Sequence, residues 1–326
     1  MCHLLNRPLI PYAALLDQWR YSLVTDKLSE TMQIANRIYS LAAEQKDSAL
    51  MIGACRALAG TLHFLGDFDA ARQYAARGVQ IWSSRRMQCG VEAVTLNPVA
   101  CLYYKALSEW HAGEIVSSQS TMTEAVSLAK ELNDMQALVL ALYWAAFLAH
   151  LRGSLAEVDR CASDMIELST RHSFTTWLPH AGVLRGWARS AGGDLVEGIS
   201  RIEEGLKDTR ATGVMLTGPF LLALKAEALH LANRTAEALE AIGEANALVE
   251  RFENRYWSAE LHRLQGLFLS ALSAEEAQIE TSLRAAIKIA KEQKSVSLEK
   301  RAEATYAEYR RQRASASGGL GFRLRI

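Results

Sequence analysis

One turn signal recurs along the chain at a nearly constant interval, and this regularity restricts the chain to a repeat architecture. It reads LGDF, AGEI, RGSL, GGDL and ANRT. The second residues of these turns are Gly66, Gly113, Gly153, Gly193 and Asn233. They are 47, 40, 40 and 40 residues apart, and one further step of 40 in each direction reaches Ser273 and Asp26. Because Gly and Asn readily adopt the left-handed backbone that ends a helix, we expect a helix to end at each of these anchors.

Small residues stand seven positions before each anchor. They are Ala59, Ala106, Ala146, Gly186, Ala226 and Gly266. Small side chains at a fixed offset let two helices approach closely, near the short end of the usual interaxial range of about 8–10 Å. Between anchors the apolar residues follow helical spacing, as in Leu138, Leu142, Ala145 and Leu148. This pattern predicts pairs of antiparallel helices repeated along the chain.

The sequence therefore predicts an all-α fold, a right-handed α-α solenoid of tetratricopeptide-like helical hairpins. We expect about seven hairpins with a period of about 40 over residues 8–293, then a last helix over Val296–Arg313. The repeat domain is residues 1–313, and the Gly- and Arg-containing tail 314–326 is expected to be disordered. The longer first interval implies an insertion, which we place in Ser83–Pro98 because Gly90 and Pro98 interrupt the helical pattern.

Composition argues against several classes of partner and location. The 36 basic and 36 acidic residues give no net charge, so neither nucleic acid nor an anionic membrane is an expected partner. The five cysteines form no CxxC pair, which favours a reduced, cytoplasmic compartment. Arg7 and two prolines interrupt the apolar N-terminus, so it does not resemble a signal peptide. The longest apolar run, Ala137–Ala149, is shorter than the roughly 18 residues that a membrane span needs.

The stretch RALAGTLHFLGDFDAARQYAARGVQIW (Arg56–Trp82) resembles the C-terminal tetratricopeptide region of bacterial multidomain signalling proteins. Further similar stretches are Ala106–Ile115, Val183–Ile199, Phe220–Ile242 and Ala259–Leu269, so the resemblance extends over most of residues 10–310. Members of that family carry a predicted ATPase module upstream, preceded by a class III adenylate cyclase domain or a winged-helix DNA-binding domain. The resemblance implies a helical arm of such a protein.

The upstream modules have no counterpart in this sequence. It contains no GxxxxGK[ST] phosphate loop, so any ATPase or cyclase activity is expected in upstream domains absent from this chain. Residues 8–24 begin directly with the first helix of a hairpin, without the polar capping helix that terminal repeats normally need. We therefore expect a missing upstream region.

Candidate binding residues follow from the repeat register. His63, His150 and His230 each stand three residues before an anchor, and Trp110 holds the equivalent place. The resemblance implies that this position, on the first helix of a hairpin, lies near the concave groove. On the same basis the residues expected to line a partner-binding groove are His63, Tyr103, Trp110, Tyr143, Phe147, His150, His180, Trp187, Glu227, His230 and Arg263. Aromatic side chains suit peptide binding, although the same residues would also serve to pack helices together.

No metal or cofactor site is predicted. The three histidines belong to repeats two apart, which separates their rings by roughly 20 Å, whereas zinc–nitrogen bonds are about 2 Å long. No catalytic residue is assigned, because adjacent acidic residues such as Glu203 and Glu204 point in different directions on a helix and no GxSxG or HExxH motif occurs. We expect a non-catalytic regulatory module that binds a protein or peptide, such as an ATPase, a cyclase or a regulator. The alternative is a small-ligand or peptide sensor domain of a transcriptional regulator.

Overall fold

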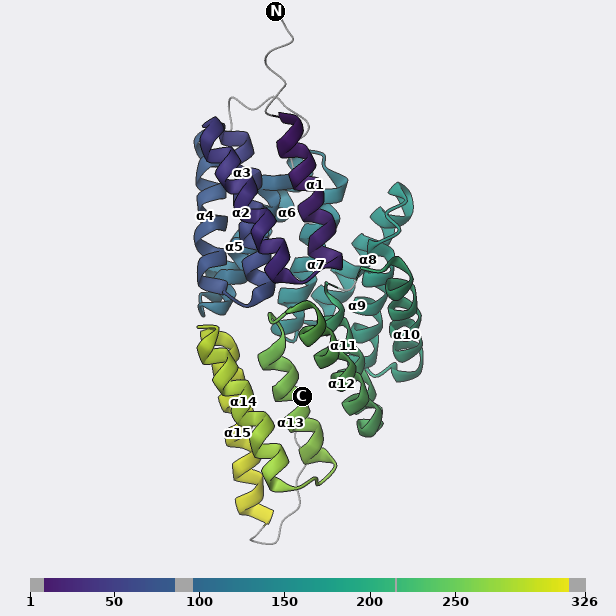
Figure 1. The fold of residues 1–326 in the computed structure, drawn as a ribbon. Coiled ribbons are helices and arrows are strands. Elements are labelled where there is room, and N and C mark those ends of the chain that lie inside the picture. The colour runs from purple at the N-terminus through teal and green to yellow at the C-terminus, as the bar shows by residue number, and fades with distance from the viewer. Residues whose placement is uncertain (1–8, 86–95, 215, 317–326) are drawn as a thin grey trace, which may run out of the picture.

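The computed structural model describes residues 9–85, 96–214 and 216–316, which form fifteen helices and no strand (Figure 1). Seven antiparallel hairpins follow one another, and each pairs two consecutive helices. The pairs are α1 (Leu9–Thr25) with α2 (Leu28–Gln45), α3 (Ser48–Leu65) with α4 (Phe68–Arg85), α5 (Leu96–His111) with α6 (Ile115–Glu131), α7 (Met135–Leu151) with α8 (Leu155–His172), α9 (Trp177–Ala191) with α10 (Leu195–Thr212), α11 (Gly218–Leu231) with α12 (Thr235–Phe252), and α13 (Ser258–Ala271) with α14 (Glu276–Glu292). The last helix, α15 (Val296–Ala316), packs on α14 and α13. The predicted solenoid of about seven hairpins and a final helix is confirmed.

The anchors end the first helix of the hairpins, as the sequence predicts. The five original anchors and Ser273 all have positive φ, from 55° at Ser273 to 103° at Gly193. Asp26 does not, so the α1–α2 turn forms without a left-handed residue. A second left-handed series ends the second helices, and its members are Lys46, Asn133, Ser173, Gly213, Glu253 and Lys294. The sequence does not reveal this series, because five different residue types hold its six positions and only one of them is Gly.

Small residues at the predicted offsets allow close helix contact. A Cβ atom added to Gly186 of α9 would lie 2.7 Å from the carbonyl oxygen of Gly198 on α10. One added to Gly198 would lie 2.6 Å from the carbonyl oxygen of Gly186. Since real side chains do not approach backbone oxygens so closely, these two helices pack at a distance that only Gly permits.

Two predicted boundaries differ from the structure. Pro98 does not interrupt a helix; it lies in the first turn of α5, where backbone N–H groups have no intrahelical acceptor and Pro is tolerated. Helix α15 continues to Ala316, three residues beyond its expected end at Arg313 and into the expected tail. Most of the expected insertion (residues 86–95) and residues 317–326 lie outside the described residues, so the disordered tail stays a prediction.

Helix α3 is long and apolar enough to cross a membrane by length and composition alone. In the protein, however, 78% of that window is buried. Burial on this scale is what a helix at the centre of a packed array shows, and α3 contacts α1, α2, α4 and α5.

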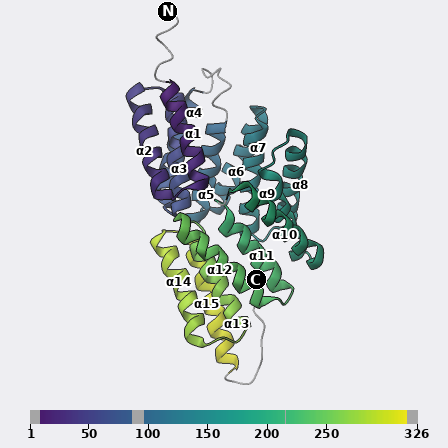
Figure 2. The same cartoon turned by 45° about the vertical axis from the view of Figure 1, so that its right-hand side comes forward.

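The array curls until its C-terminal helices lie against its N-terminal hairpins (Figures 1 and 2). We call this contact, between α3–α5 and the segment from residue 253 to α15, the seam. The backbone N–H groups of Arg255 and Tyr256 donate to the carbonyl oxygen of Phe64 at 2.8 and 3.1 Å. His111 at the end of α5 is hydrogen-bonded through Nδ1 to Ser295 Oγ at 2.8 Å. The seam joins parts of the chain that are almost 200 residues apart.

Candidate functional site

All eleven predicted groove residues lie on first helices of hairpins, from α3 to α13. These helices contact one another from repeat to repeat, so they form the inner face of the curve. Ten of the eleven are buried, each with at most 7% of the residue surface exposed, and His230 is half-buried. The seam and the neighbouring first helices cover them. Their part in partner binding therefore stays a prediction, and it applies to a covered inner face rather than to an open groove.

His63 lies at the centre of an aromatic cluster on the inner face. Six rings have centroids 5.3 to 6.1 Å from its own, and they belong to Phe64, Phe68, Tyr104, His111, Trp144 and Tyr256. Neither imidazole nitrogen of His63 has a hydrogen-bond partner. Burial lowers the pKa of His63 to about 3, so the ring is neutral at physiological pH. Its surroundings are those of a packed residue, not of a proton shuttle.

Two buried polar groups lie further along the inner face. His150 Nε2 donates to Glu227 Oε2 at 3.0 Å, and Trp187 Nε1 donates to the same oxygen at 2.6 Å. Burial alone would raise the pKa of Glu227, but His150 outweighs it and the pKa lies below its ordinary value. These three side chains come from α7, α9 and α11, so the group joins three repeats.

The second polar group ties the last helix to the array. Glu260 Oε1 accepts from Arg263 Nη2 at 2.6 Å and from Arg301 Nη2 at 2.9 Å. Burial would raise the pKa of Glu260, but the two guanidinium groups hold it well below its ordinary range. Arg301 also donates through Nη1 to the carbonyl oxygen of Leu151 at 3.1 Å. The charges in this group are thus satisfied within the protein.

A cavity of about 370 Å³ remains on the inner face between the N-terminal hairpins. The first helices of five repeats each contribute at least one aromatic side chain to its wall, and α1 and α3 also contribute an arginine each. Its ring-bearing lining residues include Trp19, Phe64, Tyr103, Tyr104, Trp144, Trp177 and His180. Two of the predicted groove residues, Tyr103 and His180, therefore line it directly. We call this space the concave cavity.

His180 is held in one tautomer at the cavity wall. Its Nδ1 donates to the carbonyl oxygen of Thr176 at 2.8 Å, so Nε2 accepts from the hydroxyl of Thr217 at 2.9 Å. Burial lowers the pKa of His180 to about 4. The ring is neutral and both of its nitrogens are occupied, which suits a wall residue better than a general base.

Arg56 also lines the concave cavity, and the sequence analysis did not single it out. It stands ten residues before its anchor, in the same register as Tyr103, Tyr143 and Arg263, and this shared register was the signal that could have identified it. Its guanidinium lies over the ring of Trp19, with Cζ 5.5 Å from the ring centroid. Arg56 is 7% exposed, so the cavity wall holds a buried positive charge.

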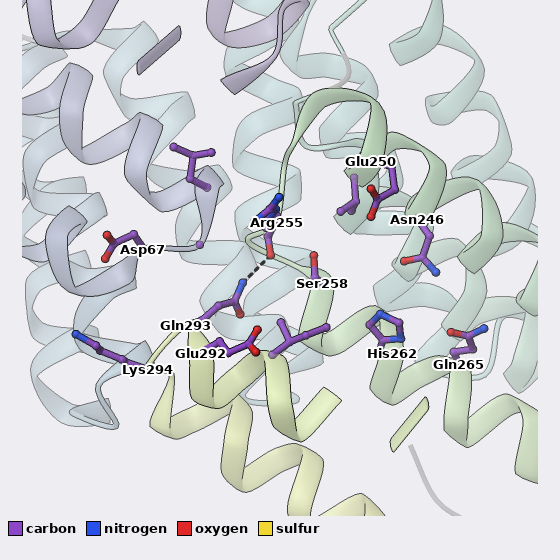
Figure 3. Close-up of a pocket in the computed structure, with 14 residues that line it drawn as sticks. Asp67, Asn246, Glu250, Arg255, Ser258, His262, Gln265, Glu292, Gln293 and Lys294 are labelled. Carbon is purple, nitrogen blue, oxygen red and sulfur yellow. Dashed lines mark hydrogen bonds between the residues drawn. The ribbon is translucent and has the colours of Figure 1, made fainter. Parts of the chain in front are cut away.

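A larger cavity, of about 790 Å³, opens at the seam between the α3–α4 turn and helices α12 to α14 (Figure 3). Its lining is mixed in charge, with Asp67, Glu250 and Glu292 beside Arg255 and Lys294. Gln293 Nε2 donates to the carbonyl oxygen of Arg255 at 2.8 Å across this cavity. Three buried polar atoms in its lining lack a hydrogen-bond partner, namely Ser258 Oγ, His262 Nδ1 and Gln293 Oε1. This cavity lies at the place where the two ends of the array meet.

Within the described residues, no group of three or more His, Cys, Asp or Glu side chains is placed to hold a metal ion. His63 contacts His111, whereas His150 is hydrogen-bonded to Glu227, so His63 and His150 belong to separate groups of side chains.

No protein-family model matches this chain. An uncharacterised protein of Rhizobium meliloti (strain 1021) is 25% identical over 203 residues, which are 62% of this chain and 20% of that protein. The chain therefore spans about a fifth of the length of this curated relative.

Several solved structures share the fold. The Rap conjugation gene regulator of plasmid pLS20, in complex with the Phr peptide, has a TM-score of 0.56 at 13% identity, covering 97% of this chain and 99% of that one. NprR in complex with its cognate peptide NprX has a TM-score of 0.58 at 11% identity, covering 94% and 88%. Aspartyl phosphate phosphatase F from Bacillus subtilis has a TM-score of 0.54 at 15% identity, covering 98% and 74%. At these identities the similarity establishes that this chain has the fold of a helical-repeat array.

Proposed function

We propose that this chain is a non-catalytic regulatory module that binds a peptide, or a short segment of a protein, in its concave cavity. The observation that carries the proposal is the cavity itself. Its wall is formed in part by α1, α3, α5, α7 and α9, which are the first helices of five successive hairpins. A ligand held there touches five repeats at once. Small changes in its fit would therefore change the curvature of the array.

Two of the similar structures support a peptide as the ligand. One is a complex with the Phr peptide and the other a complex with the NprX peptide, and both cover more than nine tenths of this chain. The cavity wall is rich in Trp and Tyr, which offer large contact areas with polar tips. Tyr103 and His180 are proposed to contact the ligand directly. The other nine predicted groove residues do not line the cavity and lie elsewhere on the first helices. We propose that their packing couples ligand binding in the cavity to the structure of the seam.

The resemblance of residues 10–310 supports a finer proposal, that the module belongs to a bacterial signalling system of the ATPase or adenylate cyclase type. The relative from Rhizobium meliloti is consistent with it, since the matched stretch is a small part of a much longer protein. In such a system any catalysis resides in other domains. The partner of this module is then an ATPase, a cyclase or a transcriptional regulator, in the same chain or another.

The second candidate is a small-ligand sensor, and the size of the concave cavity favours it. Its volume of about 370 Å³ falls within the range of about 300–1,000 Å³ that is usual for small-molecule sites. A peptide longer than a few residues would need the wall to open, whereas a metabolite would not.

The test is affinity selection with two libraries, a random hexapeptide pool and a metabolite panel, followed by binding measurements on the selected compounds. Trp177, a half-buried wall residue, is the residue to change. We expect Trp177→Ala to weaken binding about tenfold or more, because a central aromatic contact is lost. Val196→Ala is the control, since Val196 is 87% exposed on α10 and does not line the cavity.

The outcomes separate the candidates. Selected peptides that depend on Trp177 support the peptide-binding module, and selected metabolites that depend on it support the sensor. Compounds that bind Trp177→Ala as tightly as the unmodified chain would place binding elsewhere and refute both.

A further inference from the structure

Arg56 is a buried cation without an acidic partner among the described residues. Its Nη1 donates to Asn97 Oδ1 at 2.9 Å, and its Nε has no hydrogen-bond partner. The other deeply buried arginine of the inner face, Arg263, is paired with Glu260 at 2.6 Å. Burying a charge is unfavourable unless an opposite charge offsets the lost hydration, so Arg56 lacks what Arg263 has.

The surroundings of Arg56 are positive. The described residues that line the concave cavity include two arginines, Arg20 and Arg56, and no aspartate or glutamate. Arg20 has Asp17 as its ion-pair partner at 2.8 Å, but Asp17 is 73% exposed and points away to solvent. The pKa of Arg20 lies below its ordinary value because of burial first and the positive charge of Arg56 second. A partly closed cavity with charges of one sign on its wall attracts ions of the opposite sign.

The chemistry of a guanidinium narrows the ligand further. Arg presents its N–H groups in a planar fork that matches the two oxygens of a carboxylate. The Nη1 of Arg56 donates to Asn97 Oδ1, and the guanidinium also has a side-chain hydrogen bond with the Tyr103 hydroxyl, while its Nε has no partner. Trp19 lies against one face of the guanidinium, so the ring does not cover its N–H edge.

We propose that Arg56 binds a carboxylate group of the ligand that occupies the concave cavity. The inference rests on the proposed function only in taking this cavity as the ligand site. It adds that the ligand is an acid, whether the carboxylate is the C-terminus of a peptide or an acidic side chain. Arg20, at the cavity edge, is the second cation that the ligand meets.

The first experiment needs no identified ligand, because benzoate is a probe that joins a carboxylate to an aromatic ring. Thermal unfolding is measured with millimolar benzoate and with benzamide, which has the same shape and no charge. The variant is Arg56→Gln, which keeps a donor for Asn97 and removes the charge. The control is Arg37→Gln, since Arg37 is exposed on α2.

We expect benzoate to raise the unfolding temperature more than benzamide in the unmodified chain and in Arg37→Gln. In Arg56→Gln the two probes should give equal shifts. A benzoate shift that persists in Arg56→Gln, or that benzamide reproduces in the unmodified chain, would overturn the proposal. Without any probe, Arg56→Gln should unfold at the same temperature as the unmodified chain or higher, since an uncompensated buried charge is gone.

The second experiment distinguishes the two sources of the carboxylate and separates this inference from the proposed function. Hexapeptide pools are used with a free or an amidated C-terminus, each with and without Asp and Glu. We expect the preferred carboxylate to improve binding about 10- to 100-fold, and Arg56→Gln to remove that difference. Peptides that bind equally well to Arg56→Gln would refute the inference and leave the peptide-binding function intact. An Arg56-dependent benzoate shift without any peptide binding would support the inference and favour the small-ligand sensor instead.

Discussion

Replacing Gly198 by Ala tests how closely α9 and α10 approach. The added Cβ would lie 2.6 Å from the carbonyl oxygen of Gly186 and 2.8 Å from the backbone nitrogen of Ser190, both on α9. Ordinary contact begins at 3.4 Å, so the helices must separate by nearly 0.8 Å along that direction. These are backbone atoms, which cannot rotate out of the way as the end of a flexible side chain can. Overpacking of this kind costs about 1–3 kcal/mol.

One gain opposes that cost. Ala is favoured over Gly inside a helix by about 1 kcal/mol, because Gly loses more conformational freedom on folding. The net expectation for Gly198→Ala is therefore a loss of about 0–2 kcal/mol in the free energy of unfolding.

Gly182→Ala is the matched control on the same hairpin. Gly182 lies within α9, and a Cβ added to it meets no atom within 4 Å. The same chemical change should here stabilise the protein by about 0.4–1 kcal/mol. The assay is urea unfolding followed by circular dichroism at 222 nm, with midpoints compared under identical conditions. If both variants shifted the midpoint upward, α9 and α10 would not pack as closely as described, and the reasoning from the Gly186–Gly198 contact would be wrong.

Three further changes test the inner face. The folded-state pKa values of His63 and His180, about 3 and about 4, lie below the unfolded value of about 6.5, so the unfolded chain takes up protons first as the pH falls. Stability should thus be lost from pH 6.5 downward, at up to about 1.4 kcal/mol per pH unit for each ring, as urea midpoints at several pH values would reveal. His63→Phe should reduce the loss of stability at acid pH. It should also leave the protein at least as stable at pH 7.5, because two buried nitrogens without hydrogen-bond partners are removed. An unchanged dependence of stability on pH would contradict the burial of His63. Glu260→Gln should destabilise the protein by about 3–5 kcal/mol, since Arg263 and Arg301 lose their shared carboxylate, whereas Glu303→Gln, at a site 51% exposed, should change the midpoint little.

The repeat register predicted the local structure well, because a left-handed residue and a small residue act on their immediate surroundings. Gly193 ends α9 and Gly186 permits the approach of α10, whatever the rest of the array does. The curl of the whole array follows from small rotations added over seven hairpins, and no single residue determines it. The burial of Trp110 and His63 depends on that curl, so their register placed them on first helices of hairpins without revealing that the seam covers them.

Arg56 shows a different limit. Its register placed it on the inner face with Tyr103, but its importance comes from the absence of an acidic neighbour in the cavity lining. Charge pairing inside the array joins residues from different repeats, as Arg301 of α15 joins Glu260 of α13. A sequence with equal numbers of acidic and basic residues gives no indication of which of them stays unpaired.

The seam and the concave cavity should be energetically coupled, because they share helices. Phe64 lines the cavity with its ring, and its carbonyl oxygen accepts the two seam hydrogen bonds from Arg255 and Tyr256. A ligand that changes the position of α3 therefore changes the seam, and by thermodynamic reciprocity a weakened seam must change the affinity for the ligand. Arg301→Met removes two bonds that hold α15 beside the seam, to the Leu151 carbonyl oxygen of α7 and to Glu260 of α13, while the Glu260–Arg263 pair remains. We expect it to alter the affinity for a cavity ligand, measured by titration calorimetry with a selected compound, although Arg301 does not line the cavity. An unchanged affinity, in a variant whose hydrogen exchange shows a loosened α15, would mean that the two sites are independent and that the curl of the array does not report on its ligand.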